Sequence, residues 1–92
     1  MNRYTLLWLE AAIDQLAEIW LAAPDRHKIN QAINALDALL SSDPLGDLTR
    51  ELREELRATT VGAVRAIYTV QEAGRTVEIA AVRRVRDEDV PP

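Results

Sequence analysis

The chain has 92 residues, of which 48% are hydrophobic and 28% charged, a composition typical of one folded domain and not of a disordered chain. It contains no cysteine and a single histidine, His27, which excludes disulfides, thiolate metal sites and histidine-rich metal sites. The net charge is −4, from eleven basic and fifteen acidic residues. No apolar run approaches the roughly 20 residues needed to span a bilayer, and the N-terminus lacks signal-peptide anatomy, so we expect a cytoplasmic protein with no membrane partner.

The first predicted elements are a short strand and a helix. Residues 3–9 are β-branched, aromatic and leucine-rich, which favours a strand. From Glu10 onward the apolar residues repeat at helical spacing. These residues are Ile13, Leu16, Ala17, Trp20 and Leu21. Pro24 ends the helix, because a proline ring cannot continue the helical hydrogen-bond ladder. We expect both tryptophans, Trp8 and Trp20, to be core residues.

A second helix is predicted to begin after Asp25, which suits an N-cap, and to end near residues 41–46. Its apolar face consists of Ile29, Ala32, Ile33, Leu36, Leu39 and Leu40. Its solvent face consists of Lys28, Asn30, Gln31, Asn34 and Asp37. Because only a few residues connect the two helices, we expect them to form an antiparallel helical hairpin.

The second half of the chain reads mostly as strands. Residues 47–57 are an exception, because Leu48, Leu52 and Leu56 are spaced by four and propensity favours a helical turn or two there. Strands are predicted for residues 63–70 and 76–86, where apolar side chains alternate, and residues 72–75 connect them as a hairpin. The predicted fold class is α+β, in the order β-α-α-β-β-β, with an antiparallel sheet whose one face the helical hairpin covers.

This order of elements, with these residues, resembles the RelE/ParE superfamily of type II toxins, also described as plasmid stabilisation proteins. The matching stretches are the strand that ends at Trp8, the helices AAIDQLAEIW and INQAINALDALLSSDP, and the strands VRAIYTV and RTVEIAAVRRV. The resemblance covers residues 3–86, which predicts one toxin domain over residues 1–86 and a short acidic tail over residues 87–92. It also implies that residues near Arg53–Thr60 form the second strand rather than a helix.

The resemblance implies a small growth inhibitor that a cognate antitoxin protein neutralises. RelE-like members are ribonucleases that cut messenger RNA on the ribosome without a metal or organic cofactor. ParE-like members share the fold, bind DNA gyrase and lack the nuclease residues. A third reading is a degenerate member that is no longer toxic and only binds its partner. The sequence leaves open whether the chain is an enzyme and whether it forms a homodimer.

Two arginines are the candidate catalytic residues of the nuclease reading. Attack of a 2′-hydroxyl on phosphate needs a base, an acid and cations that stabilise the phosphorane, and arginines suit only the last task because they stay protonated. Arg65, three residues before Tyr68, matches the family's strand arginine. Alternation along the last strand places Arg84 on the same open face, so Arg84 is the best match to the second arginine, with Arg83 one residue away.

The remaining nuclease groups are missing from the sequence. The family's basic residues on the second strand correspond to Leu56 and Ala58, and Arg57 between them is expected to face the other way. Glu54 or Glu55 stands where other members carry a glutamate, but no histidine follows His27. We therefore favour a ParE-like toxin over a RelE-like nuclease.

Two further expectations concern surfaces. Arg65 is expected to be either functional or an ion-pair partner of Glu78 on the neighbouring strand. An apolar patch on the open sheet face, including Ile67 and Val82, is expected to bind an antitoxin segment together with the outer groove of the helical hairpin.

Overall fold

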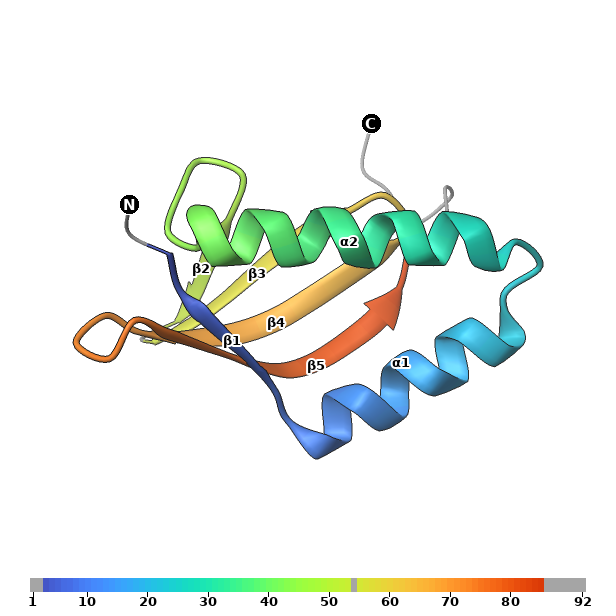
Figure 1. Cartoon of the computed structure of the whole chain (residues 1–92), viewed down its shortest axis with the longest axis horizontal. Helices are drawn as coiled ribbons and strands as arrows, with labels where there is room; N and C mark the ends of the chain where they lie inside the picture. Colours follow the sequence, from blue (N-terminus) through green and yellow to red (C-terminus); the bar gives the residue numbers. More distant parts are fainter. Residues whose placement is uncertain (1–2, 54, 86–92) are drawn as a thin grey trace.

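The structure is a computed structural model that describes residues 3–53 and 55–85. Along the chain the elements are β1 (Thr5–Trp8), α1 (Glu10–Ala22), α2 (Arg26–Ser42), β2 (Arg50–Arg53), β3 (Leu56–Val61), β4 (Val64–Gln71) and β5 (Thr76–Arg84). The strands form one sheet in the order β1-β5-β4-β3-β2, and the helices pack on it (Figure 1). The predicted α+β class and the helical hairpin over the sheet are confirmed. The predicted acidic tail, residues 87–92, lies outside the described residues.

The sheet is mixed rather than wholly antiparallel. Strands β2, β3, β4 and β5 pair with their neighbours antiparallel, as expected for a meander, but β1 runs parallel to β5 from Thr5 opposite Thr76 to Trp8 opposite Ile79. The two helices lie between β1 and the meander in the chain, so they carry the chain to the opposite edge of the sheet. The parallel pairing of β1 with β5 is therefore possible because the two helices return the chain to the other edge of the sheet.

The helix predicted for residues 47–57 is wrong. Arg50–Arg53 forms the short edge strand β2, and β3 begins at Leu56, as the family resemblance implied. The side chains of Leu48 and Leu52 are 74% and 39% exposed, so no surface covers the apolar stripe that a helix would present here. The edge of β3 instead offers unpaired N–H and C=O groups, which β2 satisfies.

The core lies between the sheet and α2. In β4 the side chains of Val64, Ala66 and Tyr68 are buried, and they meet Leu36 and Leu40 of α2. This alternation confirms the predicted period of two. The hydroxyl of Tyr68, fully buried, donates a hydrogen bond to the carbonyl oxygen of Pro44 at 2.7 Å, which anchors the loop after α2 to the centre of the sheet.

Local signals determine where the second helix begins and where the chain turns between β3 and β4. The side chain of Asp25 accepts hydrogen bonds from the backbone N–H groups of His27 and Lys28, at 3.1 and 3.3 Å, and thereby caps α2 as predicted. Gly62, between β3 and β4, has a φ of 57°, a left-handed conformation that glycine adopts without strain.

The first helix packs along the free part of β5 rather than over the centre of the sheet. β1 pairs with β5 only as far as Ile79, which leaves the edge of β5 beyond that residue unpaired by a strand. Gln15 of α1 accepts a hydrogen bond through Oε1 from the backbone N–H of Val82 at 2.9 Å. A helix side chain thus satisfies a strand edge that is otherwise open to another chain.

Candidate functional site

Two surfaces are candidates for function: the sheet face away from the helices, called the open face below, and the groove between α1 and α2. On the open face Arg65 of β4 lies directly opposite Arg83 of β5. Both side chains point away from the buried neighbour Val64, because successive residues of a strand face opposite sides of the sheet. They line a small cavity of about 150 Å³ that reaches the edge of β5 and is also lined by Gln15, Ile67, Ala81 and Val82.

The expected position of Arg84 on the open face is wrong. The β4–β5 register shifts, so that Ile67 pairs with Ala81 and Tyr68 with Ile79, which leaves Ala80 as an extra residue. Such a bulge exchanges the two faces for the residues that follow. Arg84 therefore lies opposite Val64, on the helix side, and Arg83 takes the open face beside Arg65.

The same bulge corrects the predicted apolar patch. Val82 is only 4% exposed and belongs to the core, so it is not part of an exposed surface. Ile67 is half-buried on the open face. The open face is therefore less apolar around Ile67 than the sequence indicated, and it carries the paired arginines beside Ile67.

The predicted ion pair between Arg65 and Glu78 is also wrong. Glu78 lies opposite Thr69, four residues along β4 from Arg65. Its Oε1 accepts a hydrogen bond from Nε2 of Gln71 at 3.0 Å. Arg65 instead faces another arginine, an arrangement of like charges that weakens the strand pairing and suits an anionic partner.

The residues that the sequence analysis assigned to the second strand lie on β3, and they face the sides of the sheet that were predicted. Leu56 and Ala58 pair with Thr69 and Ile67, so both lie on the open face and neither can move a proton. Arg57 pairs with Tyr68 and faces the helix side, as expected. Glu55 is exposed in the turn before β3, with a φ of 66°, and Glu54 lies outside the described residues.

Arg57 takes part in a structural network beneath the loop that follows α2. Its guanidinium donates a hydrogen bond to Oγ1 of Thr49 at 2.7 Å, and the hydroxyl of Thr49 donates to the carbonyl oxygen of Gly46 at 2.7 Å. Burial raises the pKa of the neighbouring Tyr68 hydroxyl, an effect that outweighs its hydrogen bonding with Thr49 and Arg57. A buried tyrosine that stays protonated and anchors a loop is a structural residue.

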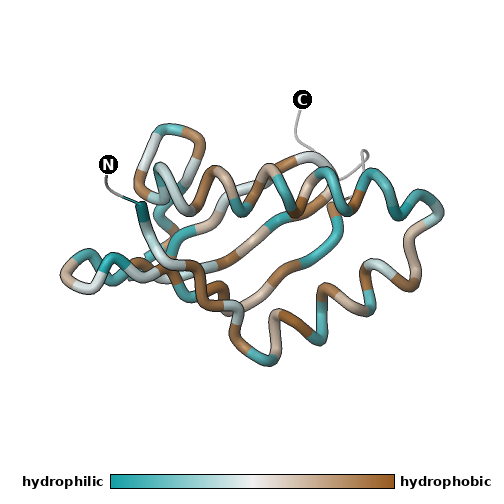
Figure 2. Tube along the Cα trace, viewed as in Figure 1, coloured by the Kyte–Doolittle hydropathy of each residue, from teal (hydrophilic) through white to brown (hydrophobic). Residues whose placement is uncertain are grey.

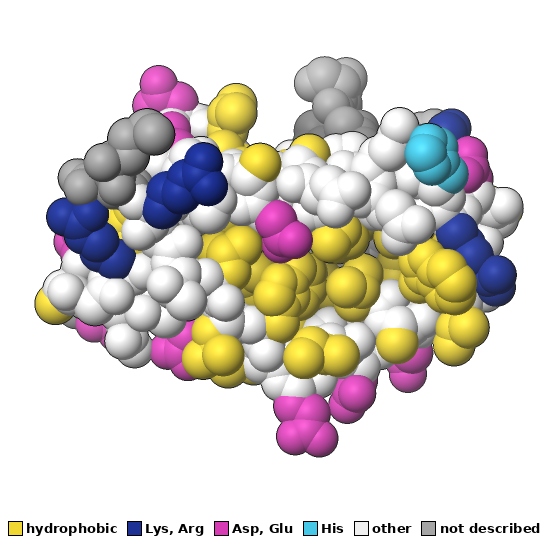
Figure 3. Space-filling view, viewed as in Figure 1, with side chains coloured by type: hydrophobic (Ala, Val, Ile, Leu, Met, Phe, Trp, Pro, Cys, Tyr) yellow, Lys and Arg dark blue, Asp and Glu magenta, His cyan; other side chains and the backbone are white. Residues whose placement is uncertain are grey.

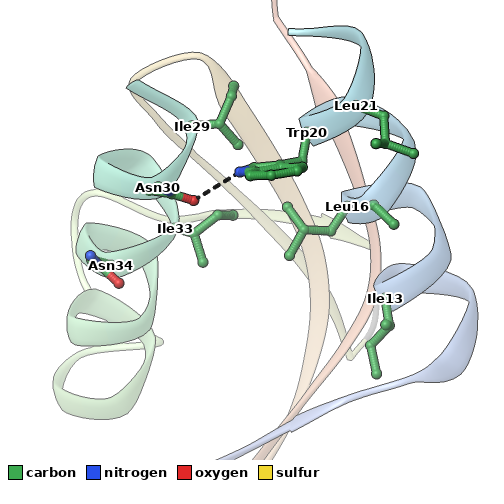
Figure 4. A pocket seen from close by; sticks show the side chains of 9 residues that line it. Ile13, Leu16, Trp20, Leu21, Ile29, Asn30, Ile33 and Asn34 are labelled. Carbon is green, nitrogen blue, oxygen red and sulfur yellow. Dashed lines mark hydrogen bonds between the residues drawn. The ribbon is translucent and has the colours of Figure 1, made fainter. Parts of the chain in front are cut away.

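The groove between the helices has a volume of about 610 Å³, against about 150 Å³ for the cavity beside Arg65 and Arg83 (Figure 4). Five of its lining residues come from α1 and four from α2: Ile13, Leu16, Ala17, Trp20, Leu21, Ile29, Asn30, Ile33 and Asn34. Figure 3 shows apolar side chains gathered between the two helices, and Figure 2 shows the hydrophobic stretches along both helices and the sheet. Three of the groove's apolar side chains, Ile13, Trp20 and Leu21, are 51%, 38% and 66% exposed, so the groove is unfilled.

Trp20 closes the loop end of the groove. Its Nε1 donates a hydrogen bond to Oδ1 of Asn30 at 3.2 Å, and the guanidinium carbon of Arg26 lies 4.4 Å from the centroid of its ring. These contacts bridge the two helices and hold Trp20 at the surface (Figure 4). The expectation that Trp20 is a core residue is therefore wrong, whereas Trp8 packs against the core as expected.

Comparison with solved structures identifies the fold. The toxin–antitoxin complex RelBE2 from Mycobacterium tuberculosis contains a chain that matches with a TM-score of 0.77 and 23% sequence identity, covering 95% of this chain and 97% of that one. The chromosomal ParDE system from P. aeruginosa matches with a TM-score of 0.68 and 19% identity over 94% and 100% of the two chains. The isolated RelE toxin of E. coli matches with a TM-score of 0.67 and 15% identity over 90% and 85%.

The chain thus has the RelE/ParE-like toxin fold, as the resemblance predicted. No protein-family model matches the chain, and no curated protein sequence matches it. Both kinds of toxin, RelE and ParE, occur among the similar structures. Neither of the two helices in the described part of the chain is long and apolar enough to cross a membrane.

Proposed function

We propose that this chain is the toxin of a type II toxin–antitoxin system, active in the cytoplasm, and that it inhibits growth by binding a target such as DNA gyrase. The observation that favours binding over catalysis is the set of residues on the open face. Arg65 and Arg83 are paired there, but the positions that would transfer protons hold Leu56 and Ala58. Two guanidiniums can hold an anionic group, but leucine and alanine at positions 56 and 58 can neither accept nor donate a proton, which favours binding over hydrolysis.

We further propose that a cognate antitoxin neutralises the chain by filling the groove between α1 and α2. RelBE2 and the P. aeruginosa ParDE system are toxin–antitoxin assemblies with similar chains. The groove offers exposed apolar side chains along two helices, the kind of surface that an amphipathic segment covers. Filling it would raise the stability of the toxin, because a ligand that binds only the folded state stabilises that state.

The second candidate is a RelE-like nuclease that cuts messenger RNA on the ribosome. The facing arginines favour it, since like charges opposite each other suit a phosphate. In this reading the 2′-hydroxyl attacks the adjacent phosphorus, the bond to the 5′-oxygen breaks, and the two protons move through groups other than the arginines. In this reading the second cation is Arg83 rather than Arg84, because Arg83 lies opposite Arg65 and Arg84 lies opposite Val64.

Induced expression of the chain alone in bacteria tests both candidates. We expect growth arrest that co-expression of the adjacent reading frame relieves, unchanged transcript ends, and reduced supercoiling by purified gyrase when the purified chain is added. Arg65→Ala should leave the arrest intact, as should the exposed control Arg53→Ala. Codon-phased transcript cleavage that Arg65→Ala and Arg83→Ala abolish, but Arg84→Ala does not, would establish the nuclease instead. Normal growth at full expression would identify a non-toxic member.

A further inference from the structure

One acidic residue extends the groove face of α2. Ile29, Ile33 and Asp37 follow one another at intervals of four residues and therefore lie along one side of the helix. Ile29 and Ile33 line the groove, so Asp37 lies one helical turn beyond its apolar lining, about 6 Å along the helix from Ile33. Asp37 is half-buried there, so its predicted place on the solvent face of α2 is wrong.

The carboxylate of Asp37 is incompletely satisfied. Its Oδ1 is buried and has no hydrogen-bond partner within residues 3–53 and 55–85. Burial raises the pKa of Asp37, and hydrogen bonding with the side chain of Trp8 offsets part of that rise. Buried polar atoms normally have a partner, so this carboxylate oxygen at the end of an unfilled groove is an available acceptor for a donor on a segment bound there.

The charges around the groove indicate which kind of side chain on a bound segment would donate to Asp37. The acidic side chains of α1, at Glu10, Asp14 and Glu18, are exposed. Figure 3 shows acidic side chains along the border of the apolar patch. The bases nearest in the chain, Arg26 and Lys28, are at the opposite, loop end of the groove, where Arg26 is held against Trp20. Away from its loop end the groove is thus bordered by acidic side chains, which favour a cationic partner.

We infer that Asp37 is a specificity-determining residue of the groove, and that it accepts a charged hydrogen bond from an arginine or lysine of the bound segment. The inference rests on the proposed function, in which the groove takes an antitoxin segment. The segment is an amphipathic helix whose apolar residues fill the space between Leu16 and Ile33, with its cation one helical turn away from the residue that packs on Ile33. A second copy of this chain is disfavoured as the occupant, because it would bring the same acidic rim to face this one.

Phage display of helical peptides on the purified full chain tests the inference. The peptides have 17 residues with leucine fixed at i, i+3, i+4 and i+7, and all other positions are randomised. The targets are the wild-type chain, Asp37→Asn, and the control Asp47→Asn, an exposed residue outside the groove lining. Ile13→Asp, which places a charge on a half-exposed groove side chain, identifies the peptides that bind in the groove.

We expect groove-dependent peptides selected on the wild type and on Asp47→Asn to be enriched in arginine or lysine at one position, and those selected on Asp37→Asn to lack this enrichment. For a selected peptide, affinity should fall about thirtyfold on Asp37→Asn, and replacing the peptide's cation with glutamine should remove the difference between the two targets. A merely structural role of Asp37 would not couple to one peptide side chain.

The inference is overturned if the enrichment is the same on both targets, if the affinity of the selected peptide does not change on Asp37→Asn, or if no peptide depends on Ile13. The proposed function is judged separately, by growth arrest and its relief. A toxic chain whose groove shows no preference for a cation would retain the proposed function and lose this inference.

Discussion

Asp37→Asn should stabilise the free protein at neutral pH. The carboxylate is half-buried on α2 with Oδ1 unpartnered among the described residues, so the folded state holds a charge that water would solvate better. Asparagine keeps the shape of the side chain and removes the charge. An unsatisfied buried polar group costs about 1–3 kcal/mol and more when it is charged, so a neutral amide recovers only the excess cost of the charge, about 1 kcal/mol for a half-buried Asp37. For a domain of this length that corresponds to a rise in Tm of about 4–8 °C.

The effect should depend on pH in a defined direction. The pKa of Asp37 is raised above its ordinary value of 3.8 in the folded state, with burial as the main cause and hydrogen bonding with Trp8 as a smaller opposing one. A carboxyl whose folded pKa is raised stabilises the fold fully below the ordinary pKa, and this contribution is lost as pH rises through the folded pKa. The free energies of unfolding of the wild type and Asp37→Asn should therefore differ most at pH 7 and converge towards pH 3.5, where both side chains are neutral in the folded state.

Thermal unfolding followed by circular dichroism at several pH values measures this difference. Asp47→Asn, at an exposed position, serves as the control and should change stability by no more than about 0.5 kcal/mol. Equal stability of Asp37→Asn and wild type at pH 7, or a lower stability of the variant, would refute the reasoning that the carboxylate is undersatisfied in the free protein. A variant that is more stable but binds groove peptides less tightly would show that Asp37 favours recognition at the expense of stability.

Three further predictions concern the sheet. Tyr68→Phe should lower the free energy of unfolding by about 1–3 kcal/mol in urea titrations, because it leaves the buried carbonyl of Pro44 without its donor, and an unchanged midpoint would contradict that anchor. Gln15→Ala should speed amide hydrogen exchange at Val82, whose N–H it leaves unpaired, and exchange as slow as in wild type would show that another group protects this edge. Arg65→Ala should leave the protein as stable as wild type or raise its stability by about 0.2–1 kcal/mol, since it relieves a facing pair of like charges, and a clear loss of stability in thermal melts would show that the pair is not repulsive.

Much of the fold follows from local patterns in the sequence. The 3.6-residue spacing of apolar side chains placed both helices, Asp25 marked the start of α2, and alternation placed the buried face of β4. These signals are readable because each depends on a few residues within one or two turns or along one strand. The places of Leu56 and Ala58 on the open face were readable too, since the register of β3 against β4 brings them to the positions that simple counting predicts.

Tertiary structure decided the features that depend on distant segments. Residues 47–57 have a helical spacing of leucines, but the unpaired edge of β3 draws residues 50–53 into the sheet as β2. The extra residue at Ala80 exchanges the faces of β5, so that Arg83 rather than Arg84 faces Arg65, and no local pattern announces a bulge whose position depends on pairing with β4. Asp37 is a polar residue in the predicted solvent face of α2, yet it is half-buried in the structure and hydrogen bonds with Trp8 of β1. A side chain's environment is set by which surface another element brings against it, and for Asp37 that surface is contributed by a strand 29 residues earlier in the chain.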